Sequence, residues 1–105
     1  MDTFSANLYD LLTAFQSVVS RFGSDPTHEV YEEVISIEEK MTEIQSMLAE
    51  FKRVVFTDLF HKKPWTRNEL IATFLAVLEI VRTRFARVVQ EKQFGDILLE
   101  KVGHE

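Results

Sequence analysis

The sequence predicts a mainly α-helical α+β fold, in which a winged-helix domain follows a separate amphipathic helix. Apolar residues recur at steps of three and four along several segments, which is typical of amphipathic helices. Two segments have the form Ser/Thr-x-x-Glu, which marks helix starts. Near the end, a Phe-Gly-Asp turn joins two apolar segments, a pattern that predicts a β-hairpin. A chain of 105 residues suffices for one domain with a single core.

The first predicted helix covers residues 3–22. Gly23 suits the left-handed residue that ends many helices, and Pro26 prevents the helix from continuing. We therefore expect a helix within residues 1–24 and a linker or short extended segment over residues 25–35. The apolar stripe of the helix contains Phe4, Leu8, Leu11, Phe15, Val18 and Phe22.

Residues 36–105 show the element order of a winged-helix domain, with a C-terminal hairpin as the wing. In a capping box, a hydroxyl and a carboxylate three residues apart satisfy free N–H groups at a helix start, and Ser36 with Glu39 and Thr66 with Glu69 have this spacing. The expected elements are a helix over 36–51, a strand over 54–56, a helical turn over 57–61, a long helix over 66–84 and strands over 85–89 and 97–102, with Gly95 near the wing tip.

Composition and charge argue against several classes of function. The formal net charge of −5 disfavours unaided binding to phosphate backbones. No apolar run approaches the roughly 20 residues that a membrane-spanning helix requires. The chain has no cysteine, which suits a reducing cytoplasm. We therefore expect a cytoplasmic protein that binds neither membranes nor specific nucleic-acid sequences.

The sequence gives little support for catalysis, a cofactor or a metal. No glycine-rich phosphate loop is present, and His28, His61 and His104 lie far apart, without the spacing of zinc ligands. Glutamates stand at positions 29, 32, 33, 38 and 39. Such a run more commonly forms a solvated acidic face than a divalent-cation site. We expect no enzyme, no cofactor and no metal site.

The long helix is unusually apolar and allows two interpretations. A core stripe consists of Leu70, Phe74, Val77, Leu78, Val81 and Phe85. Ile71 and Leu75 then lie on one flank and Ile80 on the other, so the helix is either wholly buried or offers a flank to a partner. The predicted polar face holds Glu69, Ala72, Ala76, Glu79 and Thr83, and its two glutamates argue against insertion into a DNA groove. Arg82, Arg84 and Arg87 cluster at the helix exit, where we expect ordinary solvated surface.

Two motifs in this region resemble a known family. Thr73-Phe74-Leu75-Ala76-Val77-Leu78-Glu79-Ile80, followed by Gln90-Glu91-Lys92-Gln93-Phe94-Gly95-Asp96-Ile97, is similar to the C-terminal winged helix of bacterial kleisins, the segregation and condensation proteins A. Val55-Phe56 with Leu59-Phe60 is similar to the family's preceding motif. The family usually has Pro where this chain has Gln93, and tends to have Gly where Arg84 stands.

The resemblance implies a binding role within a chromosome-segregation complex. It implies that the winged helix docks on the head of an SMC ATPase, so helping to close a ring around DNA, and that the preceding middle region contacts the ScpB dimer. ATP then belongs to the SMC partner, and the protein is associated with the nucleoid. We expect the SMC-head anchors to be Ile71, Leu75, Phe94 and Ile97. Leu8, Leu11 and Phe15 are expected either to bind ScpB or to pack within the chain.

Two other functions are compatible with the same pattern. One is a winged-helix transcription regulator that dimerises through its N-terminal helix, and the other is a helical adaptor unrelated to chromosomes. A regulator should bind duplex DNA, with an affinity that falls steeply as the salt concentration rises. An acidic kleisin segment should not bind duplex DNA.

Overall fold

The computed structural model describes residues 4–5, 8–22, 36–60, 66–90, 92 and 95–103. It confirms the mainly α-helical α+β class and the order expected from residue 36 onward. The predicted linker over 25–35 lies outside the described residues. In chain order, the elements are β1 Phe4–Ser5, α1 Leu8–Phe22, α2 Ile37–Phe51, β2 Arg53–Val55, the 3-10 helix η2 Phe56–Phe60, α3 Arg67–Arg82, β3 Ala86–Gln90 and β4 Ile97–Lys101.

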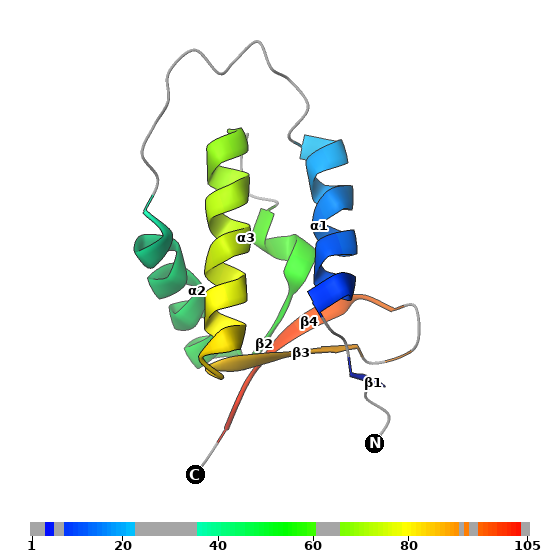
Figure 1. The fold of residues 1–105 in the computed structure, drawn as a ribbon. Helices are drawn as coiled ribbons and strands as arrows, with labels where there is room; N and C mark the ends of the chain where they lie inside the picture. The colour runs from blue at the N-terminus through cyan, green and yellow to red at the C-terminus, as the bar shows by residue number, and fades with distance from the viewer. Residues whose placement is uncertain are drawn as a thin grey trace.

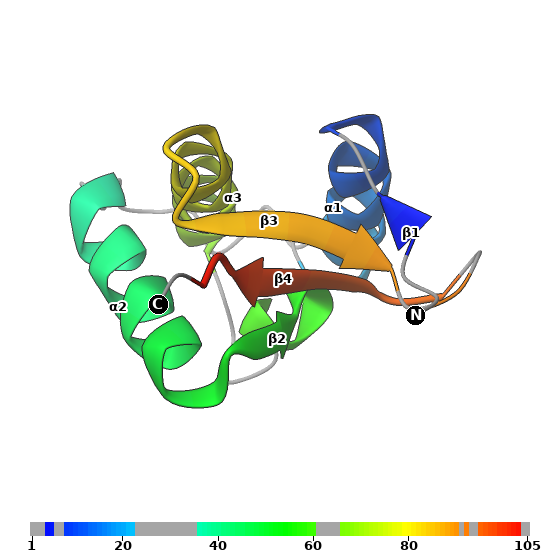
Figure 2. The same cartoon turned by 90° about the horizontal axis from the view of Figure 1, so that it is seen from below.

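The three α-helices stand on one side of a small sheet, with α3 between α1 and α2 (Figure 1). All strand pairs are antiparallel, and the strand order is β1-β3-β4-β2. The wing hairpin pairs Ala86 with Lys101 at one end and Gln90 with Ile97 at the other. Viewed from below, β1 lies beside β3 at the edge of the sheet (Figure 2).

Strand β1 corrects the predicted start of the first helix. Phe4 and Ser5 pair with Gln90 and Val89 of β3, and the helix begins only at Leu8. The four-residue step from Phe4 to Leu8 is also the spacing of a helical stripe, which is why a helix was predicted there. The edge of β3 offers backbone hydrogen bonds to Phe4 and Ser5, and the periodicity of the local sequence cannot reveal this distant strand.

Both predicted helix starts at the capping motifs are confirmed. The Ser36 hydroxyl accepts a hydrogen bond from the Glu39 N–H at 3.1 Å. At α3 the box is reciprocal, because Glu69 N donates to Thr66 Oγ1 at 3.1 Å and Thr66 N donates to Glu69 Oε1 at 3.5 Å. These bonds fix where α2 and α3 begin.

Two residues after the end of helix α3, the chain passes through a residue with an unfavourable backbone conformation. Arg84 N donates to Val81 O at 3.0 Å, and Phe85 N donates to Ile80 O at 3.1 Å. These two bonds form a Schellman motif, which requires a left-handed residue after the helix. Arg84 occupies that position with a φ of 68°. Glycine adopts this conformation without the steric cost of a Cβ, which explains its preference at such a position.

The N-terminal helix contributes directly to the hydrophobic core. Leu11 and Val18 are buried, and the Phe15 ring stacks on Phe74 of α3 with centroids 4.2 Å apart and planes 9° apart. Phe15 also lies 6.0 Å from Phe60 of η2, measured between ring centroids. Of the two expectations for the apolar stripe, the structure therefore shows intramolecular packing for Leu11 and Phe15.

We predict that Phe15→Ala lowers the free energy of unfolding by about 3–5 kcal/mol, because it leaves a cavity against Phe74 and Phe60. Chemical denaturation measures this change. Leu12→Ala is the matched control on the same helix, since Leu12 is 44% exposed, and it should cost less than about 1 kcal/mol. Equal effects of the two substitutions would show that α1 is not part of the core.

We predict that Arg84→Gly stabilises the fold by about 1 kcal/mol, because it removes the Cβ from a left-handed residue. For a domain of this size the melting temperature should rise by roughly 4–8 °C, which calorimetry can measure. Arg84→Ala removes the charge but keeps the Cβ, so it should not stabilise. If the alanine variant gains as much as the glycine variant, the backbone explanation fails.

Candidate partner-binding surface

Helix α3 buries a wider face than the core stripe that its sequence predicted. Leu70 and Val77 of that stripe are buried, and residues expected outside the stripe are buried as well. Ala72 and Ala76 were expected on a polar face and Ile80 on a flank, yet their exposed fractions are 5%, 0% and 0%. Lys40 Nζ of α2 lies 3.8 Å from Glu69 Oε2 of α3. Glu69 is on the same face of α3 as Ala72 and Ala76, so this face is turned toward α2. The prediction of a polar face was therefore wrong for the two alanines, whose small side chains let α2 pack closely.

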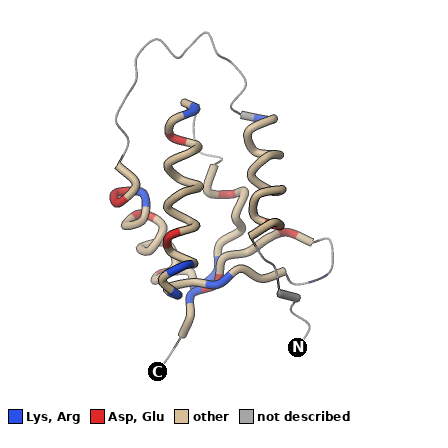
Figure 3. The backbone as a smooth tube through the Cα atoms, viewed as in Figure 1, with Lys and Arg blue, Asp and Glu red and all other residues tan. Residues whose placement is uncertain are grey.

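The two predicted anchors on α3 are exposed and adjacent. Ile71 is 43% exposed and Leu75 is 41% exposed. They lie four residues apart and hence on the same side of the helix. The helix carries no charged residue between Glu69 and Glu79, so this stretch of α3 is uncharged in Figure 3.

The other two predicted anchors do not extend this surface within the described residues. Phe94 lies outside them. Ile97 is half-buried and packs against the core. It pairs with Gln90, at the end of β3 that is remote from α3. Leu75 lies about two helical turns before the end of α3. The structure thus brings Ile71 and Leu75 together and places Ile97 elsewhere.

Leu75 also lines an open groove between α2 and α3. Ile37, Met41 and Leu78 supply the rest of its apolar lining, and Ile37 is 37% exposed. Ile37 and Met41 share the apolar stripe of α2 with Ile44 and Leu48. That stripe begins before the buried Ile44 and Leu48, at Ile37 and Met41. A stripe longer than the core requires is the feature of the sequence that could have predicted the groove.

We call Ile37, Met41, Ile71, Leu75 and Leu78 the α3 flank. Glu38, Glu79 and Arg82 lie at the margin of its groove. The hydrogen bond from Arg82 lowers the pKa of Glu79, and the same bond raises the pKa of Arg82. Both groups therefore stay ionised at neutral pH and neutralise each other, so the α3 flank presents apolar surface beside a compensated ion pair.

The predicted anchors on α1 divide into buried and exposed residues. Leu11 and Phe15 belong to the core, whereas Leu8 is 62% exposed. Tyr9 and Leu12 are exposed on the same helix. The exposed large apolar side chains on the described part of α1 are therefore Leu8, Tyr9 and Leu12.

Other kinds of site find no support in the described part of the chain. There, no group of three metal-ligating side chains comes together. His28, His61 and His104 lie outside the described residues. Among the residues that the structure places, no helix is both long enough and apolar enough to cross a membrane.

Comparison with known proteins assigns the chain to a family. The family described as segregation and condensation protein ScpA matches residues 1–101. Segregation and condensation protein A of Brevibacillus brevis is 34% identical over 102 residues, which cover 96% of this chain and 40% of the relative. The protein of the same name from Bacillus subtilis is 36% identical over 99 residues, covering 90% of this chain and 38% of the relative.

A third relative gives a similar result. Segregation and condensation protein A of Myxococcus xanthus is 36% identical over 90 residues, which cover 85% of this chain and 31% of the relative. The chain thus spans between 31% and 40% of the length of these relatives, and no solved structure matches it significantly. Since the family match covers almost every residue, the chain belongs to the segregation and condensation protein A family.

Proposed function

We propose that this chain is a non-catalytic module that binds the head of an SMC ATPase and helps to close the SMC–ScpA–ScpB ring in chromosome condensation and segregation. The family assignment supports a role in this process. In this proposal the SMC partner binds and hydrolyses ATP, and the module works in the cytoplasm at the nucleoid.

The observation that carries the proposal is the exposed α3 flank. Ile37, Ile71 and Leu75 are each more than a third exposed, although the core beside them is already filled by Leu70, Val77 and Ile80. Adjacent exposed apolar side chains beside a groove are typical of protein–protein contacts. The energy of such contacts is concentrated in a few apolar anchors near their centre.

The exposed side of α3 favours this function over the transcription regulator. A DNA-reading helix presents basic or amide side chains to base edges, whereas the exposed middle of α3 presents Ile71 and Leu75. The family assignment also gives no support to a regulator. An electrophoretic mobility titration across salt concentrations should detect no duplex binding by the isolated chain.

We further propose that the ScpB dimer meets the outer side of α1. Leu8, Tyr9 and Leu12 are 62%, 74% and 44% exposed, and they form the apolar surface of α1 that the core does not use. Binding there leaves the α3 flank free, because α1 and α2 lie on opposite sides of α3 (Figure 1).

We predict that Leu75→Lys weakens binding to a purified SMC head by about thirtyfold or more, because it places a charge in an apolar contact. Ile71→Lys should act in the same direction. Co-purification and calorimetric titration measure the affinity, and a thermal melt confirms that each variant folds. Leu12→Lys is the control, since Leu12 is as exposed as Leu75 but lies on α1.

Wild-type affinity in folded Leu75→Lys and Ile71→Lys variants would place the interface elsewhere. Ile97→Lys belongs to a different test, because Ile97 packs against the core. We expect that substitution to lower the melting temperature.

A further inference from the structure

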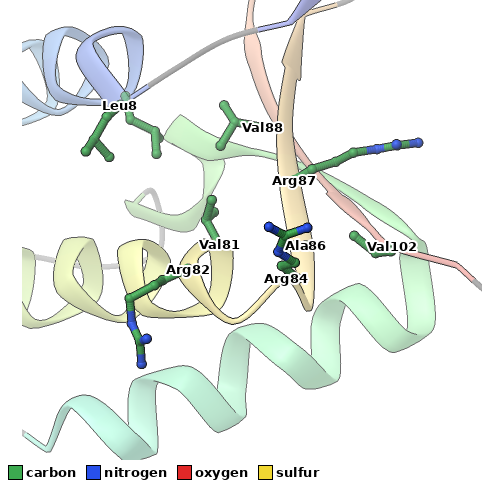
Figure 4. Close-up of a pocket in the computed structure, with 9 residues that line it drawn as sticks. Leu8, Val81, Arg82, Arg84, Ala86, Arg87, Val88 and Val102 are labelled. Atoms are coloured by element: carbon green, nitrogen blue, oxygen red, sulfur yellow. The ribbon is translucent and has the colours of Figure 1, made fainter.

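The groove of the α3 flank has an apolar floor and carries charge only at its margin. Its charged lining residues are Glu38 of α2 and Glu79 and Arg82 of α3. Figure 4 shows Arg82 on the side of α3 that faces α2, whereas Leu8 and Val88 lie beyond the opposite side of that helix. The sign of the charge at this margin decides which kind of partner surface the groove can receive.

Two of the three marginal charges compensate each other. Arg82 donates hydrogen bonds to both carboxylate oxygens of Glu79, and the bond from Nε is 3.0 Å long. A bidentate pair of this kind holds both groups in a defined geometry. The α3 side of the margin is therefore close to neutral.

Glu38 carries the one uncompensated charge among the residues that line the groove. Its side chain is exposed, and no described residue forms an ion pair with its carboxylate. The Thr42 hydroxyl donates to the backbone carbonyl of Glu38, at 3.1 Å, and leaves the carboxylate free. Lys40 lies 3.8 Å from both Glu43 and Glu69, and its side chain is only 13% exposed. The groove thus combines an apolar floor with a margin that is negative on the α2 side.

We propose that the partner surface filling this groove presents apolar side chains bordered by a basic side chain, and that the basic group pairs with Glu38. This inference rests on the SMC-head function proposed above and specifies the chemistry of the surface that the head offers. A basic group beside Glu38 is attracted to it, and Glu79 already neutralises the nearby Arg82. An acidic group at the same place would meet an unpaired carboxylate while the groove loses its water, which is unfavourable.

Substitutions that change charge but hardly change size test the proposal, with calorimetric titration of a purified SMC head as the measurement. Glu38→Gln should weaken binding roughly threefold to fivefold, because it removes the pairing carboxylate. Glu39→Gln is the matched control, since Glu39 is exposed in the same first turn of α2 but does not line the groove. Both variants lose the same favourable interaction with the start of the helix. The control should change the affinity by less than about twofold.

The ion pair on α3 gives a second test, in which the sign of the effect is decisive. Arg82→Gln leaves the Glu79 carboxylate unpaired and should strengthen binding about twofold to threefold. Glu79→Gln leaves Arg82 unpaired and should weaken binding by a similar factor. Both variants lose the same pair within the helix, so a merely structural role of the pair would change the affinity in the same direction in each.

The dependence on salt concentration gives a third test. Added salt should weaken binding of the wild-type chain, because it screens the pair that Glu38 makes at the margin of the contact. The Glu38→Gln variant should respond less to salt than the wild-type chain does. Equal responses would show that Glu38 makes no charge pair with the partner.

Several results would overturn the proposal. Wild-type affinity in a folded Glu38→Gln variant, or equal losses in Glu38→Gln and Glu39→Gln, would exclude a basic group at this place. Tighter binding by Glu79→Gln would indicate an acidic partner surface instead. If Leu75→Lys abolishes binding and Glu38→Gln does not change it, the SMC-head function stands and only the charge pairing fails. If neither variant changes the affinity, or if the wild-type chain does not bind the head, both proposals fail.

Discussion

The stacking of Phe15 on Phe74 is the contact on which the arrangement of the domain depends. It joins α1 to α3, and the proximity of Phe15 to Phe60 extends the same cluster to η2. Phe56 adds an edge contact to both Phe60 and Phe74. Aromatic side chains bury large apolar areas in such geometries. Because three segments far apart in sequence meet at these rings, the N-terminal helix is a structural part of the domain.

This constraint decides which surfaces remain for partners. With α1 on one side of α3, α2 on the other and the hairpin at its C-terminal end, the central helix is covered in three directions (Figure 1). Ile71 and Leu75 occupy part of what remains. On the described part of α1, Leu8, Tyr9 and Leu12 are the large apolar side chains that stay exposed. A single packing arrangement therefore produces two separate exposed surfaces.

Local sequence signals predicted much of the fold, and tertiary contacts account for the rest. The two N-cap motifs and the Gly95 hairpin are encoded within a few residues, so their elements were predicted correctly. The pairing of Phe4 with Gln90 and the burial of Ala76 depend on segments distant in sequence, and periodicity cannot reveal them. For the candidate site, Ile71 and Leu75 followed from the excess apolar width of α3. The contribution of Ile37 depends on how α2 lies against α3.

Hydrogen–deuterium exchange of the chain, alone and with a purified SMC head, tests the central claim most directly. Backbone amides are protected where a partner covers them, so the measurement locates the interface without any substitution. The account predicts added protection at the start of α2 and in the middle of α3, around Ile37 and Leu75, with α1 unchanged. Protection confined to α1, or no protection under conditions in which the two proteins co-purify, would contradict it.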